Sequence, residues 1–286
     1  MENGKLNILN KFFTRNTFRH LIEEGNDIAY TSVIKRYIDT PDDKMNAELV
    51  SEIYSVLRKN YRNEYFYKNT LLNKLLLGVH SINTTTALTE IPIEHSKADF
   101  VLINGKAVVY EIKTELDNLD RLESQINDYY KAFDHVAVVT CKDNLPELEK
   151  KIAMLGKPVG IYVLQKQGSL SLIRMPGKYS DLIDKGTLFK ILRKAEYEDI
   201  ILSKYESLPR VTQFKYYSEC RKLFSRIAID EVYELFLKQL KKRSHIVKEE
   251  LEDIPYEIKF LVYFMELRDF EYEKLSAFLN SVYGGG

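Results

Sequence analysis

The chain has 286 residues, of which 45% are hydrophobic and 29% are charged, and its 42 acidic and 42 basic side chains balance. This is an ordinary globular composition for one large or two modest domains, and it excludes general electrostatic attraction to nucleic acid, so that any such contact must be local. The two cysteines, Cys141 and Cys220, have neither zinc-site spacing nor a secreted disulfide pattern, and no apolar run reaches membrane-spanning length. With no signal-peptide core at the N-terminus, we expect a cytoplasmic protein without a membrane contact.

The first part of the chain has a helical pattern. Apolar and basic residues alternate at helical spacing over residues 6–38, residues 39–43 interrupt the pattern, and a further helix is expected over 47–57. The basic side chains of this segment could contact DNA, or they could be the charged outer faces of packing helices. A helix over residues 71–77 is opened by the segment from Arg62 to Lys68, and a strand is expected over 85–93.

A β-hairpin is the next expected element. The runs 100–103 and 107–110 are rich in branched and aromatic residues, and Asn104-Gly105 between them is a strong turn signal. Side chains alternate along a strand, so Asp99 shares a face with Glu111 only if paired residue numbers sum to an even value. We therefore predict a three-residue turn, with Gly105 in the left-handed region, or a bulge.

Three charged side chains at the end of this hairpin indicate a site. Asp99 and the Glu111-Ile112-Lys113 element end strands that are apolar on both faces, where isolated charges are costly. Two close carboxylates favour a cation between them, and their hard oxygen atoms select Mg²⁺ or Mn²⁺. Lys113 would then support a water nucleophile or the developing charge. The simpler alternative is an ion pair between Glu111 and Lys113 at the end of a strand.

A strand–helix–strand unit follows the hairpin. Apolar residues recur at helical spacing over residues 117–133, and residues 136–139 form a buried strand. Arg121, Gln125 and Tyr129 lie at four-residue steps beside the apolar stripe of the helix. These side chains could border a cleft and hold a phosphate and a base, or they could form a solvated helix edge.

The last third of the chain changes to helices. Two strands are expected over 159–164 and 170–174, and helices follow over 182–205, 212–227, 231–242 (behind an Asp230 cap) and 256–283, with a break near Asp269. Positive charge concentrates here, in Arg221, Lys222 and their neighbours. This cluster could grip a phosphate backbone, although basic residues near the end of a helix also suit the helix dipole.

Taken together, the chain resembles the PD-(D/E)XK nuclease superfamily over residues 60–165. Asp99 matches the aspartate and Glu111-Ile112-Lys113 the (D/E)XK element, although Ala98 replaces the usual proline. Gln125 and Tyr129 match the Gln-x-x-x-Tyr motif of RecB-type members, and the stretch from Glu111 to Gln125 is similar to poorly characterised bacterial and phage-encoded members.

The resemblance implies a fold class and three segments. The fold is α/β, with a restriction-endonuclease-like core, a mixed central β-sheet flanked by helices, and helical N-terminal and C-terminal additions. The expected segments are an N-terminal helical segment over 1–45, the nuclease-like core over 46–178 and a helical C-terminal region over 179–286.

The resemblance also implies a metal-dependent deoxyribonuclease. Asp99 and Glu111 would bind Mg²⁺ or Mn²⁺, and family members usually add a glutamate from the helix before the first core strand. Glu64 fits that place on a partly buried helix face, Glu90 is a second candidate, and a first-turn glutamate favoured by the helix dipole is the alternative for Glu64.

Catalytic roles would fall to Asp99, Glu111, Lys113, Gln125 and Tyr129. Contacts with DNA would involve four basic residues: Arg121, Lys68, Arg221 and Lys222. His95 and Lys97 are close enough in sequence to touch a substrate.

Several alternatives remain open at this point. RNA is not excluded as the substrate, and a protein partner or a homo-oligomer is possible. A catalytically silent nucleic-acid- or protein-binding module on a nuclease fold is the second interpretation. The biological role could be repair, phage defence or mobile-element maintenance.

Overall fold

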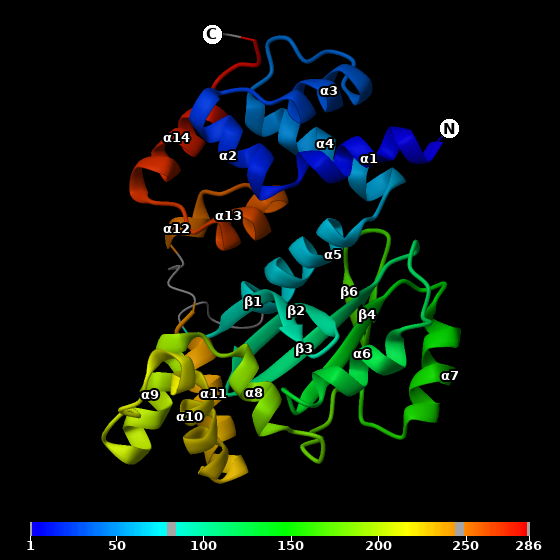
Figure 1. Ribbon diagram of the computed structural model, residues 1–286. Helices are drawn as coiled ribbons and strands as arrows, with labels where there is room; N and C mark the ends of the chain where they lie inside the picture. Colours follow the sequence, from blue (N-terminus) through cyan, green and yellow to red (C-terminus); the bar gives the residue numbers. More distant parts are fainter. Residues whose placement is uncertain (1, 79–83, 244–248, 285–286) are drawn as a thin grey trace. The chain divides into compact units, whose positions relative to one another are not determined.

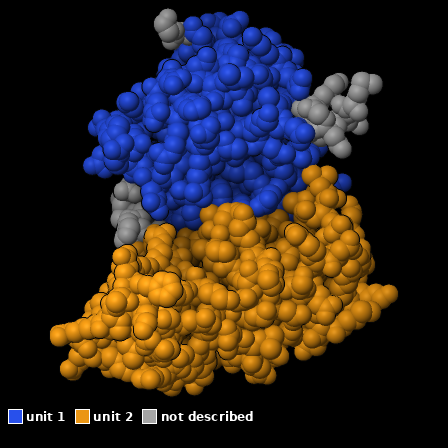
Figure 2. Space-filling model, in the orientation of Figure 1, with its two compact units in different colours: residues 1–83, 164–170, 246–286 blue, residues 84–163, 171–245 orange. Residues whose placement is uncertain are grey.

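The computed structural model describes residues 2–78, 84–243 and 249–284 (Figure 1). The chain divides into two compact units (Figure 2), which are described separately below. The helical unit comprises residues 1–83, 164–170 and 246–286, and the sheet unit comprises residues 84–163 and 171–245. This division cuts across the three segments expected from the sequence, because residues 246–286 group with the N-terminal helices and not with the helices that precede them.

The helical unit begins with short helices where the sequence pattern predicts a long helical stretch. Thr14 caps the second helix by accepting a hydrogen bond from Thr17 N, Gly25 ends it at φ 71°, and Asp27 caps the third. The described helices of this unit are α1 (Glu2–Phe12), α2 (Arg15–Glu24), α3 (Ile28–Tyr37), α4 (Asn46–Asn60), α5 (Glu64–Leu71), the π-helical turn η1 (Leu72–Leu76), α12 (Glu249–Glu252), the 3₁₀ turn η2 (Tyr256–Ile258), α13 (Lys259–Met265) and α14 (Asp269–Leu279).

A buried asparagine joins the two ends of the chain within the helical unit. The Asn46 side chain accepts a hydrogen bond from the Tyr30 hydroxyl and donates to the carbonyl oxygens of Phe278 and Ser281. Buried polar groups are costly without partners, and these bonds satisfy both ends of the amide. The interaction explains why the C-terminal helices group with the N-terminal ones.

Within the described residues, the sheet has six strands in the order β1-β2-β3-β4-β5-β6. The strands are β1 (Thr86–Ile93), β2 (Ser96–Asn104), β3 (Lys106–Lys113), β4 (His135–Thr140), β5 (Gly160–Leu164) and β6 (Leu170–Arg174). The first three strands pair antiparallel, whereas β3, β4 and β5 pair parallel. The crossovers contain α6 (Leu122–Tyr129) and α7 (Leu145–Leu155). The expected mixed sheet flanked by helices is therefore confirmed.

The turn between β2 and β3 has the predicted geometry. Ile103 pairs with Ala107 and Asn104 with Lys106, so paired numbers sum to an even value, and Gly105 has φ 68°. A residue with a Cβ atom is strained in this left-handed region, so glycine suits the position. The predicted even register and the left-handed Gly105 are confirmed, and the ladder continues to Asn104 and Lys106 on either side of Gly105.

The helices after the sheet are shorter than predicted. Residues 182–205 form two helices because Leu192 and Arg193 are extended, and the N-cap of α11 is Ala228, with Asp230 inside the first turn, which corrects the predicted cap. Likewise, α6 begins only at Leu122 because residues 114–120 form turns, in which Asp117 accepts hydrogen bonds from Thr114. The C-terminal helices of this unit are α8 (Lys185–Ile191), α9 (Lys194–Tyr205), α10 (Gln213–Arg226) and α11 (Ile229–Lys241).

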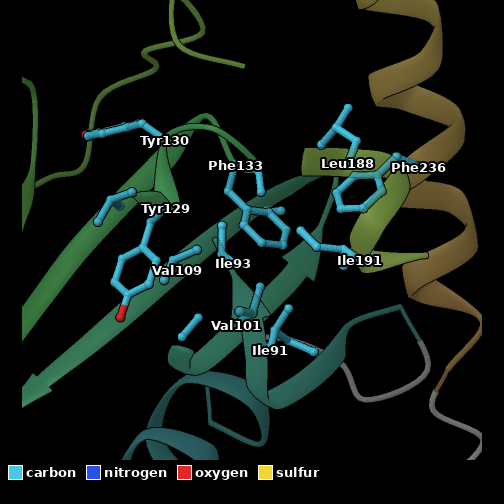
Figure 3. Packing of buried hydrophobic residues seen from close by; sticks show 14 of the residues in the cluster. Ile91, Ile93, Val101, Val109, Tyr129, Tyr130, Phe133, Leu188, Ile191 and Phe236 are labelled. Carbon is cyan, nitrogen blue, oxygen red and sulfur yellow. The ribbon is translucent and has the colours of Figure 1, made fainter. Parts of the chain in front are cut away.

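One core connects the sheet with the helices of this unit. Side chains from β1, β2 and β3 pack with side chains from α6, α8 and α11 (Figure 3), including Ile91, Ile93, Val101, Val109, Tyr129, Leu188, Ile191 and Phe236. Burial of these apolar groups stabilises the fold and fixes α6 against the sheet. None of the described helices combines the length and the apolar character needed to cross a lipid bilayer.

Candidate functional site

The two predicted carboxylates lie where the β2–β3 ladder ends. The last pair of the β2–β3 ladder is Phe100 with Tyr110, so Asp99 and Glu111 are the residues next to the end of this ladder on the two strands. The Asp99 carboxylate accepts a hydrogen bond from the Ile112 backbone N at 2.8 Å, which ties the end of β2 to β3. Asp99 and Glu111 both lie near the Tyr129 hydroxyl, whose pKa both of their charges raise, and a shared metal site stays a prediction.

Glu111 is at the centre of a buried polar network. The residue is 1% exposed, and its Oε1 accepts hydrogen bonds from Lys113 Nζ at 2.9 Å and Gln125 Nε2 at 2.6 Å. Lys113 Nζ also donates to Gln125 Oε1 at 2.8 Å, and the Tyr129 hydroxyl donates to Glu111 Oε2. The buried charge of Glu111 is therefore balanced by Lys113 and bonded on both oxygens, as a buried carboxylate requires.

Tyr129 is a fixed donor in this network. Burial, and then the negative charge of Glu111, raises the pKa of Tyr129 far above its ordinary value, and the charge of Asp99 adds to the effect. The phenol remains protonated at all physiological pH values. Its oxygen also lies 3.0 Å from the Lys97 carbonyl oxygen, so the single phenolic proton has two acceptors, one on β2 and one on β3.

The strands β1 and β2 both lose their regular alternation where Glu90 faces Asp99. On β1, Leu88 and Ile91 are three residues apart, yet both belong to the core that contains α6. On β2, Ala98 and Val101 are also three residues apart, and both belong to the same core. Regular strands put residues of odd separation on opposite faces. The ladder has no pair between Thr89–Phe100 and Ile91–Ala98, which is the position of Glu90 and Asp99.

Glu90 has an unusual backbone conformation at this irregularity. Its φ is 59°, a region that side chains with a Cβ atom rarely adopt and that costs about 1–3 kcal/mol. A carboxylate oxygen of Glu90 lies within 4.8 Å of one from Asp99, and Glu90 also forms an ion pair with Lys97. The structure thus brings Glu90, the weaker of the two predicted additional ligands, close to Asp99.

Glu64 differs from its predicted description. It opens α5 in the helical unit, its side chain is 55% exposed, and it forms an ion pair with Lys68. The expected burial of Glu64 is therefore not observed, and its first-turn position suits the helix dipole. Lys68 is itself buried and pairs with Glu64, and its predicted contact with DNA stays a prediction. A role for Glu64 as a metal ligand stays a prediction.

The other predicted residues lie on exposed surfaces of the sheet unit. Arg121 is exposed at the N-terminus of α6, and two further exposed residues are His95, in the turn between β1 and β2, and Lys97, near the start of β2. Arg221 and Lys222 are both exposed on α10, where Lys222 forms an ion pair with Glu219. The structure brings Gln125 and Tyr129 together with Glu111 and leaves Arg121 outside that network.

Sequence reasoning missed the contact that anchors the start of β2. The Ser96 hydroxyl donates to Asp128 Oδ2 at 2.8 Å, and Lys131 donates to Asp128 Oδ1. Burial would raise the pKa of Asp128, but the hydrogen bonds from Lys131 and Ser96 outweigh it and hold the pKa below its usual value. An acid in the last turn of a helix opposes the dipole, and this signal could have indicated a specific partner for Asp128.

The donor atoms of the site suit a hard divalent cation. Asp99 and Glu90 supply neighbouring carboxylate oxygens, the ligand type that Mg²⁺ and Mn²⁺ prefer, whereas Glu111 does not join this group of possible ligands among the described residues. Glu111 Oε1 accepts two hydrogen bonds and Oε2 accepts one, so a lone pair of Oε2 is left for a further contact. The ammonium of Lys113 lies beside these oxygens, a combination suited to a phosphate and its attacking water.

Comparison with known proteins identifies the family of this chain. Protein cII of Enterobacteria phage P4 is 22% identical over 187 residues, which cover 64% of this chain and 64% of that protein, so the match spans less than two thirds of the relative. No solved structure is significantly similar to the chain. The family model described as Bacteriophage P4 protein cII matches residues 57–253, which are more than half of the chain and include the whole site in the sheet unit. The chain therefore belongs to the bacteriophage P4 cII protein family.

Proposed function

We propose that the chain is a metal-dependent nuclease that hydrolyses phosphodiester bonds of DNA. The observation that carries the proposal is the convergence of Asp99, Glu111 and Lys113 at the end of paired strands, with Gln125 and Tyr129 bonded to the same carboxylate. The element order α5-β1-β2-β3-α6-β4 further supports a restriction-endonuclease-like core, in which these residues occupy the positions of the PD-(D/E)XK and Gln-x-x-x-Tyr motifs.

Each side chain has a role that follows from its contacts. Asp99 and Glu111 would hold the cation, Glu90 is placed to assist from β1, and a bound Mg²⁺ or Mn²⁺ would supply Lewis-acid activation of the phosphate. Lys113 would offer its ammonium to the water or the scissile phosphate. Gln125 orients Lys113 and Glu111 together, and Tyr129 fixes the second oxygen of Glu111.

The geometry also favours a second candidate, a silent nucleic-acid- or protein-binding module. The favouring observation is the bonding of Glu111: both of its oxygens already accept hydrogen bonds from protein groups in a buried network. In that case Lys113 neutralises a structural charge, and the network only holds α6 on the sheet.

Cleavage assays with matched variants separate the two candidates. Supercoiled, linear duplex and single-stranded DNA are incubated with Mg²⁺ or Mn²⁺, using the wild type, Asp99→Asn, Lys113→Gln and the control Asp120→Asn. Asp120 is an exposed acid in the loop before α6. The nuclease predicts a loss of at least about a hundredfold for Asp99→Asn and Lys113→Gln, with Asp120→Asn unchanged.

Folding and metal binding are measured on the same proteins. Circular dichroism shows whether each variant folds, and thermal unfolding with and without the metal shows whether the cation binds the folded wild type. If neither metal stabilises the wild type, and the folded Asp99→Asn protein cleaves DNA as well as the wild type does, the nuclease proposal is wrong.

A further inference from the structure

The outer surface of α10 has a composition unlike that of the other helices of the sheet unit. Seven of its exposed residues form two adjacent rows along the helix, while the exposed Gln213 and Tyr217 lie outside these rows and the half-buried Glu219 lies in the second. Phe214, Ser218, Arg221 and Ser225 make one row, and Lys215, Lys222 and Arg226 make the other. We call these seven residues the α10 face.

We propose that the α10 face binds single-stranded DNA, with phosphates on its basic side chains and an unpaired base on Phe214. The inference rests on the proposed function and adds to it a binding surface and the strandedness of the ligand. It goes beyond the predicted basic cluster because the structure separates the basic residues that are accessible from those that are used inside the protein.

The charge of α10 is largely uncompensated. The helix carries four basic residues and one acid, Glu219, which pairs with Lys222. Within the part of the chain that the structure describes, Lys215, Arg221 and Arg226 form no ion pair with an acid. Accessible guanidinium and ammonium groups on one helix favour binding of a polyanion.

The basic end of α11 provides the contrast. Lys242 pairs with Asp199, and Arg243 donates two hydrogen bonds to Glu196, whose pKa is lowered because the hydrogen bonds and charge of Arg243 outweigh burial. Arg243 also donates to the Ile191 carbonyl oxygen, which fixes it between helices. Arg243, whose side chain is 9% exposed, therefore holds the helices together and is not available to a ligand, whereas Lys242 forms only an exposed surface pair.

The exposure of the Phe214 ring indicates a ligand with unpaired bases. Its side chain is 94% exposed in the first turn of α10, an unusual position for a large apolar ring. Tyr217, one turn further on, is 49% exposed and its ring is held by contacts with Phe189 and Tyr197. Exposed aromatic rings among basic side chains stack on bases of single strands, whereas a duplex keeps its bases inside the helix.

The size of the surface matches a short stretch of strand. With 14 residues, α10 is about 20 Å long, which is enough for several nucleotides. Salt dependence of binding should therefore reflect several phosphate contacts.

Fluorescence anisotropy in EDTA tests the inference without cleavage. The probe is a labelled single-stranded 20-mer of mixed sequence, and duplex DNA, single-stranded RNA and heparin are compared with it. Arg221→Glu/Arg226→Glu is expected to weaken binding of the single strand at least about tenfold and to lower the slope of log affinity against log salt by about two. The matched control, Lys150→Glu/Lys238→Glu, makes the same charge change on exposed residues of α7 and α11 and should retain the wild-type affinity.

A second pair of variants tests the stacking. Phe214→Ala is expected to weaken single-strand binding about tenfold while heparin binding is unchanged, and Phe214→Trp should restore it. Equal effects of the α10 and control charge changes, or no binding by the wild type, would overturn the inference. If duplex DNA and heparin bind as tightly as the single-stranded probe, and Phe214→Ala has no effect, the assignment of single-stranded DNA as the ligand is wrong.

The outcome is independent of the nuclease test. The assay has no metal, so loss of binding by the α10 variants supports the inference even if Asp99→Asn proves the catalytic proposal wrong. Conversely, if Asp99→Asn abolishes cleavage but the α10 variants bind single-stranded DNA normally, the nuclease proposal holds and the proposed binding surface is wrong.

Discussion

The strand ends around Glu111 and the outer face of α10 both concentrate charge, but they do so in opposite ways. At Glu111 the charges are buried, and each is paired and bonded by neighbours from β3 and α6. On α10 the charges are exposed, and three of the four basic groups lack an acid partner among the described residues. Burial fixes geometry at a cost that pairing must offset, whereas exposure costs little and leaves the charge available to a ligand. The comparison predicts very different responses to substitution.

The largest expected effect on the free energy of unfolding comes from removing the charge of Lys113, which balances Glu111. Lys113→Met leaves a buried carboxylate without its cation and should lower the free energy of unfolding by about 3–5 kcal/mol. Arg221→Met on α10, which removes an exposed charge, should change it by less than about 0.5 kcal/mol. Urea denaturation of the two variants measures the difference, and similar values for both would remove the distinction between the two regions.

The phenol that bonds Glu111 should have the next largest effect. Tyr129→Phe removes a hydrogen bond to a buried charged group and should cost about 1.5–3 kcal/mol of unfolding free energy. Tyr217→Phe on α10 is the matched control, because no hydrogen bond is described for its hydroxyl, and it should be nearly neutral. A stable Tyr129→Phe protein would show that water or another group replaces the phenol.

The turn that sets the register should have a moderate effect. Gly105→Ala places a Cβ atom in the left-handed region, where nothing lies within 4 Å, so backbone strain alone should cost about 1–2 kcal/mol. Thermal unfolding measures this loss. Wild-type stability of Gly105→Ala would indicate that the turn can change its conformation without penalty.

The smallest expected effect is a change in the pH dependence of the melting temperature, through Glu94 in the turn between β1 and β2. Hydrogen bonds from Thr187 and Lys190 lower the pKa of Glu94, so this group stabilises the fold above the carboxyl pKa of the unfolded chain and loses that contribution as pH falls through the folded pKa. Thr187→Val removes one of these bonds. The fall in melting temperature between pH 7 and pH 3.5 should therefore be smaller in Thr187→Val than in the wild type, and an equal or larger fall would contradict the assignment.

Local sequence patterns determined the hairpin, the crossover helix and their order. Apolar runs and the Asn104-Gly105 turn signal were enough to predict the hairpin, and the parity of residue numbers showed which register a site shared by Asp99 and Glu111 would need; the structure has that register. The four-residue spacing of Gln125 and Tyr129 put both beside the apolar stripe of α6, and the structure shows that both bond to Glu111 of β3. These features depend on the period of a strand or helix, which the sequence contains directly.

Only the tertiary structure decided the partners of each charge. Sequence spacing could not show that Glu90 adopts a left-handed conformation opposite Asp99, that Lys68 is buried, or that Arg243 is used by Glu196 while Arg221 remains accessible. The grouping of residues 246–286 with the N-terminal helices likewise arises from contacts such as those of Asn46, across more than 200 residues. Such contacts join segments far apart in the chain, and their energies depend on burial and on the neighbours that packing supplies, which no local pattern encodes.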